Sequence, residues 1–350
     1  MEKVFIAGGT GMLGAAAAKA LSDAGVKVVV SSRKDRDEIG EMLTEYSPLI
    51  EVEKVELLDL ESVEAAFAKH AFDGMAVVAH THQYAQTRDK NNEIYPILIN
   101  CFETARKSGV KRAVMAGSMA VYGGLTPPLT ETVTFPPIVG ASAGADRDMM
   151  KTFEVATKRA IEIIVMDYGD DFQMGLSIPP GLQKPEPHEL ETVILRAPLM
   201  FGPGYQALGN PLSSAAHVAA GRIDRFQGFA AYGGAPAEAL WASLSSIPVN
   251  YVKDNAECIR IALTADTLPN RIYNINSGFS RSPREQFEAI LRAAPDSADR
   301  MGITPEDLPN EAVDLGFTGD LFEEDFGWTS SYSLESALAD YIGWLKDHPY

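Results

Sequence analysis

Three glycines near the start of the chain have a spacing that suits phosphate binding. Gly8, Gly11 and Gly14 follow the apolar run at residues 4–7 and precede an alanine-rich stretch at residues 15–21. This order predicts a strand, a tight turn and a helix. The first glycine permits a positive φ, the second lets backbone approach a pyrophosphate, and the third allows close helix–strand packing. Phosphates would then lie at a helix N-terminus, so the segment predicts dinucleotide binding.

The elements that must position this site alternate along the first 200 residues. Apolar, β-branched runs occupy residues 4–7, 26–30, 52–57, 76–79, 113–116 and 192–196. Helical patterns lie between them, near residues 12–24, 35–46, 61–70, 91–108 and 146–168. Such alternation is typical of an α/β protein with a doubly wound parallel sheet. Residues 170–191, rich in proline and glycine, are predicted to form an ordered surface insertion.

The regular alternation ends after Gly202-Pro203-Gly204. A region of small residues follows at 205–246, then an apolar run at 249–252, a helix from Asp254, a strand at 271–275 and C-terminal helices. We therefore predict a dinucleotide-binding domain made of residues 1–200 and 247–276. Residues 201–246 and 277–350 would form a smaller, discontinuous substrate-binding lobe, with the substrate between the two.

Composition limits the classes of partner. The 350 residues are 46% hydrophobic, enough for a large core, and no run approaches the roughly 18 apolar residues of a membrane span. The first residues form a core strand rather than a basic leader, so a cytoplasmic location is expected. A net charge of −18 repels nucleic acid and anionic membranes, which leaves a small molecule as the expected partner. The only cysteines, Cys101 and Cys258, have no metal or redox spacing.

Motifs spread along the chain carry a resemblance to a known family. They are the glycine triplet, Leu58-Asp59-Leu60, Gly109-Val110-Lys111-Arg112, Ser118-x-x-Val121-Tyr122-Gly123, Arg196-x-Pro198, Gly202-Pro203-Gly204, Tyr251-Val252-x-Asp254 and Phe326-Gly327-Trp328. With these motifs the chain resembles the extended short-chain dehydrogenase/reductase family, which contains sugar epimerases, dehydratases and many ketone reductases. The resemblance implies a Rossmann-type fold and a nicotinamide cofactor. It specifies the reaction much less closely, because one fold hosts many chemistries.

The residues after the second strand favour NADP over NAD. Where NAD-binding members carry an acid for the adenosine ribose, this chain has Ser32, followed by Arg33, Lys34 and Arg36. An acid would repel a 2′-phosphate, whereas arginine can hold it with two hydrogen bonds. A solvated basic segment is the simpler alternative. The cofactor-binding residues that the resemblance implies are Gly8, Thr10, Gly11, Met12, Leu13, Gly14, Ser32, Arg33, Asp59, Leu60 and Lys158.

Two catalytic positions match the family. Ser118 corresponds to the serine or threonine whose hydroxyl donates to a substrate oxygen, although it also suits a strand-end cap. Lys158 corresponds to the lysine of Tyr-x-x-x-Lys, which grips the nicotinamide ribose. The tyrosine is missing, because Glu154 stands four residues before Lys158. Glu154 is either half of a surface ion pair or a general base, and an ionised carboxylate would donate a proton poorly.

Another group must therefore supply the proton in a reduction. His80, His82 and Tyr84 follow the strand that in the family ends near the nicotinamide, and an imidazole or a phenol could serve. These residues also suit an ordinary loop, and Tyr122 is a further candidate. The two histidines lack a third ligand at recognisable spacing, so no metal site is predicted.

The substrate side also departs from sugar-nucleotide enzymes. Leu199 replaces their asparagine, and residues 245–249 lack their arginine, so a smaller or more apolar substrate is favoured. Three interpretations follow. The leading one is an NADP-dependent oxidoreductase that interconverts a ketone or aldehyde and an alcohol. The others are a lyase or isomerase, such as an epimerase or dehydratase, that uses Glu154 as base, and a dinucleotide sensor without chemistry.

A homodimer is expected, since related proteins commonly pair the helices near residues 91–108 and 146–168. The residues that recur at helical spacing on this face are Met149, Met150, Phe153, Ala156, Ala160 and Ile164, although an intramolecular core would show the same pattern.

Overall fold

The structure is a computed structural model that describes residues 1–34, 47–80, 92–133, 149–169, 190–204, 211–223, 247–279 and 281–348. In the helix that begins at Met149, side chains are described from Val155 onward. The helix expected at residues 35–46 lies outside the described residues, as do residues 170–189 of the expected insertion and residues 205–210 and 224–246 of the second lobe.

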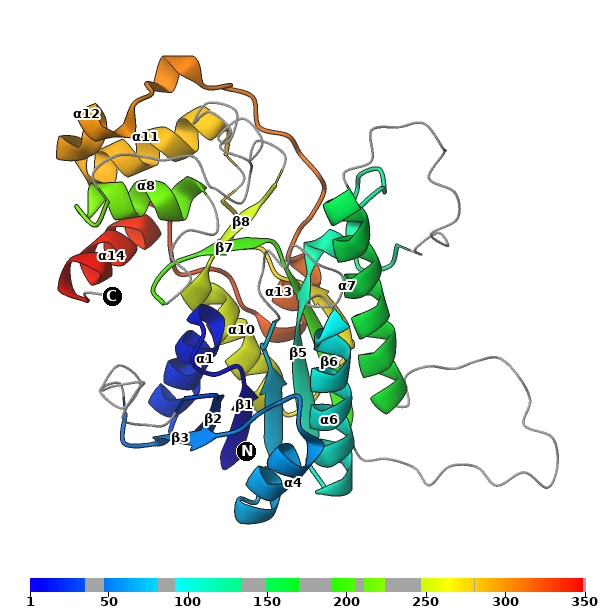
Figure 1. Ribbon diagram of the computed structural model, residues 1–350. Coiled ribbons are helices and arrows are strands. Elements are labelled where there is room, and N and C mark those ends of the chain that lie inside the picture. The colour runs from blue at the N-terminus through cyan, green and yellow to red at the C-terminus, as the bar shows by residue number, and fades with distance from the viewer. Residues whose placement is uncertain are drawn as a thin grey trace.

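Seven parallel strands form the central sheet (Figure 1). Their order is β3 (Ile50–Lys54), β2 (Lys27–Ser32), β1 (Lys3–Ala7), β4 (Gly74–Val77), β5 (Arg112–Ser118), β6 (Glu191–Ala197) and β9 (Ile272–Asn274). The doubly wound parallel sheet predicted from the alternating pattern is confirmed, and so is the Rossmann-type fold that the resemblance implies. The chain order reverses between β1 and β4, and folds of this type bind ligands beside such a reversal, at the carboxyl ends of the strands.

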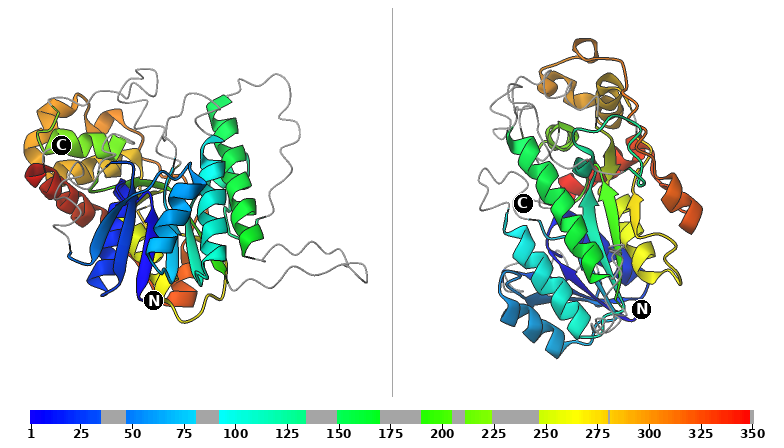
Figure 2. Two further views of the ribbon diagram at one scale, coloured as in Figure 1. Left: turned by 60° about the horizontal axis from the view of Figure 1, so that its bottom comes forward. Right: turned by 90° about the vertical axis from the view of Figure 1, so that its right-hand side faces the viewer.

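Helices cover both faces of this sheet (Figure 2). α1 (Met12–Asp23) and α10 (Val252–Thr264) pack on one face, where Val4 and Ile6 point. α4 (Leu60–Lys69), α6 (Ile94–Lys107) and α7 (Met149–Tyr168) pack on the other, where Phe5 and Ala7 point. Alternate residues of one buried strand thus enter two cores, which explains its continuous apolar sequence.

A second group of elements lies beyond the carboxyl end of the sheet (Figure 1). The short strands β7 (Leu199–Phe201) and β8 (Val249–Tyr251) pair there, and α8 (Pro211–Ala219), α11 (Pro283–Ala293) and α14 (Leu334–Asp347) share a separate apolar core. The remaining helices of the described residues are η1 (Met119–Tyr122), η4 (Pro295–Ser297), α12 (Ala298–Met301), η5 (Pro305–Asp307) and α13 (Asp320–Phe326). The boundaries proposed between the two lobes stay a prediction.

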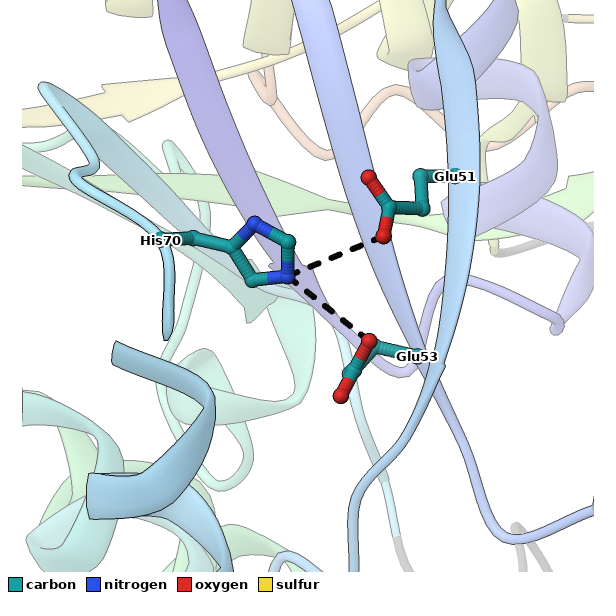
Figure 3. Close-up of side chains that lie close together, drawn as sticks. All are labelled: Glu51, Glu53 and His70. Carbon is teal, nitrogen blue, oxygen red and sulfur yellow. Dashed lines mark ion pairs between the residues drawn. The ribbon is translucent and has the colours of Figure 1, made fainter. Parts of the chain in front are cut away.

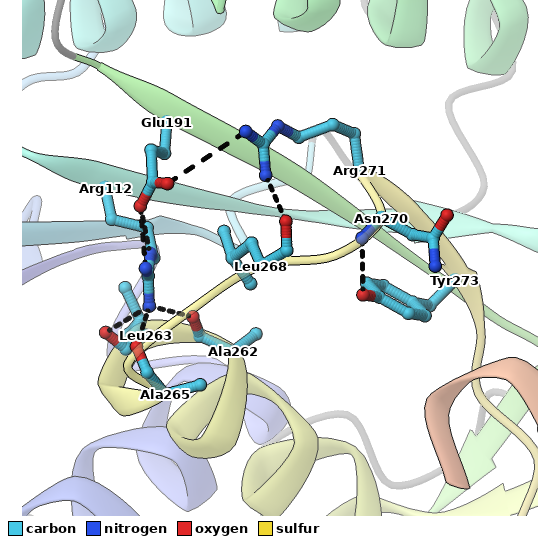
Figure 4. A network of polar contacts seen from close by, with 9 residues as sticks. All are labelled: Arg112, Glu191, Ala262, Leu263, Ala265, Leu268, Asn270, Arg271 and Tyr273. Carbon is cyan, nitrogen blue, oxygen red and sulfur yellow. Dashed lines mark hydrogen bonds and ion pairs between the residues drawn. The ribbon is translucent and has the colours of Figure 1, made fainter. Parts of the chain in front are cut away.

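An arginine closes the amino end of the sheet (Figure 4). Arg112, at the start of β5, is 6% exposed, and its Nε and Nη2 lie 2.9 and 2.6 Å from Oε2 of Glu191 on β6. Its Nη1 donates to the carbonyls of Ala262 and Ala265, where α10 ends. One side chain therefore joins two strands and also satisfies carbonyls that the end of a helix leaves without partners.

Candidate functional site

The glycine triplet forms the turn between β1 and α1. Gly8 has φ of +86°, and a β-carbon there would lie 2.6 Å from Cα of Ala79. A β-carbon on Gly14 would lie 2.3 Å from the carbonyl oxygen of Gly8. Gly11 differs, because the nearest described atom to a β-carbon there is the Gly8 oxygen, at 3.5 Å. Two glycines are thus required by packing, while Gly11 leaves open space before the first turn of α1.

Two further contacts hold this turn in place. The hydroxyl of Ser31, on β2, accepts a hydrogen bond from the backbone N–H of Gly8 at 2.8 Å. Gly204, with φ of +134°, lies so close to the start of α1 that a β-carbon would be 2.5 Å from Cα of Met12. The sequence analysis missed Ser31, and its only signal was a small polar residue at the end of an apolar strand.

The other candidate cofactor residues lie nearby along the strand ends. Ser32 is 5% exposed, and its hydroxyl accepts from the backbone N–H of Lys34 at 2.9 Å, while Arg33 and Lys34 are exposed. Arg36 lies outside the described residues. Asp59 is the N-cap of α4, accepting from the N–H of Glu61 at 3.1 Å. Thr10 lies in the glycine turn, Leu13 is buried in α1, and Leu60 is 39% exposed at the start of α4.

Two of the candidate catalytic side chains meet. His80 follows the end of β4 and is exposed, whereas Lys158 lies in α7 and is 7% exposed. The ammonium nitrogen of Lys158 contacts Nε2 of His80 across 78 positions of sequence. A charged lysine can only donate, so Nε2 accepts and the ring proton lies on Nδ1. His82 and Tyr84 lie outside the described residues, and so does the side chain of Glu154.

The residues after Lys158 fix the register of α7. Arg159 donates to the carbonyls of Val121 and Gly123 at 2.8 and 2.9 Å, which ties the helix to the turn that follows β5. Glu162 accepts two hydrogen bonds from Arg196 of β6, at 2.9 and 2.7 Å, and both side chains are less than 5% exposed. These two anchoring residues, Arg159 and Glu162, therefore hold Lys158 at the carboxyl end of the sheet.

Ser118 ends β5 beside this helix. Its hydroxyl caps η1 by accepting from the N–H of Ala120 at 3.1 Å, which matches the simpler of its two expected roles and leaves the catalytic role untested. The hydroxyl proton remains available to another acceptor, because this bond uses only an oxygen lone pair.

Tyr122 is not placed to replace the missing tyrosine. It is 2% exposed, donates to Oδ1 of Asn274 at 2.7 Å and accepts from Arg196 at 2.7 Å. Burial raises the pKa of its hydroxyl above the ordinary value. The interpretation of Tyr122 as a further proton donor is therefore wrong, because its proton is engaged within a buried network.

Comparison with known proteins identifies the family. Residues 4–276 match the model of the NAD dependent epimerase/dehydratase family. The chain belongs to this family. Mouse UDP-glucose 4-epimerase is 29% identical over 136 residues, which span 35% of this chain and 39% of that protein. The resemblance inferred from the motifs is thus confirmed.

Solved structures share the fold of this epimerase/dehydratase family member at low identity. UDP-glucose 4-epimerase from Bifidobacterium longum, in complex with NAD+ and UDP, has a TM-score of 0.69 with 16% identity over 99% of each chain. A partial consensus L-threonine 3-dehydrogenase has a TM-score of 0.69 with 17% identity over 99% of this chain and 100% of that one. Among the described residues, no helix is long and apolar enough to cross a membrane. The expected cytoplasmic location stays a prediction.

The nicotinamide dinucleotide of this family fits the carboxyl end of the sheet. Gly11, the N-cap of α1, carries no side chain that could fill the space before the helix or bond its first N–H groups. Unpaired N–H groups and the positive end of a helix dipole favour phosphate. The exposed guanidinium of Arg33 follows the neighbouring strand. Open backbone and nearby positive charge are the features that such a ligand requires.

Proposed function

We propose that the chain is an NADP-dependent oxidoreductase that interconverts a ketone or aldehyde and the corresponding alcohol, with His80 and Lys158 moving the proton. The contact between these two side chains carries the proposal, because it places an imidazole against the family's lysine position, one turn after the missing tyrosine. An imidazole changes protonation near neutral pH, so it can both give and take a proton there.

The cofactor site would use the residues predicted from the sequence. Gly8, Thr10, Gly11, Met12, Leu13 and Gly14 would hold the pyrophosphate; Ser32 and Arg33 would hold the 2′-phosphate; and Asp59 and Leu60 would flank the adenine. Bound NADP supplies the hydride donor or acceptor for the reaction. Arg33 favours NADP because its guanidinium matches a phosphate, and NAD remains the less favoured cofactor.

The proton would move through the histidine. In the reducing direction, Nδ1–H of His80 gives its proton to the substrate oxygen, and Nε2 takes one from the ammonium of Lys158. The ring then carries its proton on Nε2. Nε2 returns that proton to the Lys158 amine and Nδ1 takes one from water, which restores the starting state after one turnover. Ser118 would donate its hydroxyl proton in a hydrogen bond to the same substrate oxygen, which stabilises the negative charge that develops there.

Isotope transfer would test this proposal. Protein should be incubated with NADPH carrying deuterium at C4 and a panel of small and apolar ketones and aldehydes; deuterium at the carbinol carbon of a product is the expected result. His80→Gln should lower turnover about 100-fold, as expected for loss of a general acid, while His348→Gln, at the end of α14, should have no effect. Deuterium transfer that is undiminished in His80→Gln would contradict the relay.

A second candidate function is an epimerase or dehydratase. The family match and the mouse relative favour it, and Glu154 would then act as the base one helical turn before Lys158. Such an enzyme returns its cofactor to the starting state in each cycle. If Glu154 removes a carbon-bound proton, incubation with a substrate in D2O should put solvent deuterium into that substrate without net consumption of the nicotinamide cofactor, and Glu154→Gln should abolish the exchange.

We also propose a homodimer formed through α6 and α7. These helices pack side by side, and each leaves an isoleucine open to solvent: Ile99 is 44% and Ile163 is 53% exposed. On the face predicted from the sequence, Ala156, Ala160 and Ile164 are partly exposed, whereas the side chains of Met149, Met150 and Phe153 lie outside the description. Light scattering should give a dimer mass for the parent protein and a monomer mass for Ile163→Asp.

A further inference from the structure

Two glutamates and a histidine converge beside the edge strand of the sheet (Figure 3). Glu51 and Glu53 are two positions apart on β3, so both side chains lie on one face of the strand. His70 follows the last turn of α4 and points its Nε2 between them. Oε1 of Glu51 is 3.8 Å and Oε2 of Glu53 is 3.7 Å from that nitrogen. The three ligand atoms all lie within 4.8 Å of one another.

The imidazole in this cluster is buried without full hydrogen bonding. The side chain of His70 is 6% exposed, and among the residues that the structure describes its Nε2 has no hydrogen-bond partner. The two carboxylate oxygens are too distant for hydrogen bonds, which require about 2.7–3.2 Å. A buried polar atom without a partner costs free energy, so a group seated between Nε2 and the carboxylates would stabilise the fold.

We propose that Glu51, Glu53 and His70 bind a divalent transition metal ion of the Zn²⁺ type. One imidazole nitrogen with two carboxylate oxygens suits Zn²⁺, Co²⁺ or Mn²⁺ better than Mg²⁺ or Ca²⁺, which prefer oxygen ligands alone. Bonds of about 2.1 Å in a tetrahedron place ligand atoms about 3.4 Å apart. The observed 3.7 and 3.8 Å from Nε2 therefore require a small contraction, and the two carboxylate oxygens, which lie within 4.8 Å of each other, would also have to move together. Glu51 is 48% exposed, which gives the ion a path from solvent.

Two lysines would compete with this ion. Nζ of Lys69 lies 2.6 Å from Oε2 of Glu53, and Nζ of Lys3 lies 2.8 Å from Nδ1 of His70. Metal binding at Nε2 requires the ring proton to be on Nδ1, so Lys3 would have to turn away, and Lys69 would have to release the carboxylate. Lys69 is 56% exposed and can swing into water at little cost. The ion would then join the edge strand β3 to the end of α4.

Calorimetry of untagged protein titrated with ZnCl2, with CoCl2 absorption as a second readout, would test the site. Glu51→Gln and His70→Gln should each weaken Zn²⁺ binding at least tenfold, whereas Lys69→Met should tighten it severalfold. The exposed position of Glu51 keeps the first variant foldable if His70→Gln is not. Two matched controls should bind Zn²⁺ as the parent does. One is Glu64→Gln, on α4. The other is His80→Gln, because His80 follows β4 whereas His70 precedes it.

Three results would overturn the proposal. One is parent protein that binds no Zn²⁺ at micromolar concentration. Another is binding that survives Glu51→Gln but falls in His80→Gln, which would place the ion at the other end of β4. The third is weaker binding by Lys69→Met, because the lysine would then be supporting the site rather than competing with the ion.

Discussion

The two ends of the parallel sheet differ in the partners of their charged side chains. At the amino end, Arg112 is fixed between Glu191 and the last carbonyls of α10, and Asp73 accepts from two backbone N–H groups, so the charges serve the fold. At the carboxyl end, the ammonium of Lys158 contacts the imidazole of His80, and Gly11 leaves open space before the first turn of α1. The comparison teaches that the charges at the amino end serve the fold, while the carboxyl end, where this fold binds ligands, combines a fixed pair, Arg196 and Glu162, with a contact between a lysine and an imidazole.

The largest expected effect comes from the buried pair of Arg196 and Glu162, near the carboxyl end of the sheet. Arg196→Met would leave Glu162 buried at 3% exposure without its partner, and breaking such a pair costs about 3–5 kcal/mol. Urea unfolding followed by circular dichroism would measure the loss. A loss below about 1 kcal/mol would show that this end does not depend on fixed charge at all.

A buried histidine outside the sheet extends the comparison to the second core. Burial lowers the pKa of His217, in α8, from 6.5 to about 4. Between pH 6.5 and pH 4 this imidazole is therefore protonated in the unfolded chain and neutral in the folded chain. The free energy of unfolding consequently falls as the pH drops from 6.5 toward 4. The loss is about 3 kcal/mol at most. Thermal unfolding should show a smaller drop between pH 7 and 4.5 in His217→Gln, and equal drops in both proteins would contradict this.

Replacing the buried arginine at the amino end of the sheet should cost less stability. Arg112→Met removes an arginine that is buried like Arg196, but its partner Glu191 is 39% exposed and can regain water. We expect a loss of about 1–2 kcal/mol, because only the helix-end carbonyls lose a partner. The same urea measurement gives the answer. A loss as large as that of Arg196→Met would show that the exposure of the glutamate partner does not determine the cost of removing the arginine.

Much of this comparison was predictable from sequence and part was not. The strands were predictable because buried parallel strands are continuous apolar runs. Lys158 was singled out by the family resemblance. The contacts that distinguish the two ends join distant positions: 78 residues separate His80 from Lys158, and 79 separate Arg112 from Glu191. No local pattern encodes such pairs. β7, with three residues, is too short to show any periodicity. The hydroxyl of Tyr122 donates to Asn274, a residue 152 positions away that only the fold brings close to it.

The smallest predicted effect concerns the choice of cofactor. Arg33→Ala should remove most of a tenfold preference for NADPH over NADH, because one charged contact to the 2′-phosphate is worth on the order of 1.5 to 3 kcal/mol. Calorimetry with both nucleotides would measure it. Equal affinities in the parent protein would show that the basic residues after β2 do not read the 2′-phosphate.

The central claim is that the carboxyl end of the sheet holds a nicotinamide dinucleotide, and Gly11→Ala tests it most directly. A β-carbon at Gly11 has 3.5 Å to its nearest described neighbour and φ there is −79°, so the fold should tolerate alanine. The methyl group would occupy the space that a pyrophosphate needs. Calorimetry should show at least a tenfold loss of NADPH affinity in Gly11→Ala, with a melting temperature near that of the parent. Gly343→Ala, on α14, should bind as the parent does. Unchanged affinity in Gly11→Ala would contradict the account.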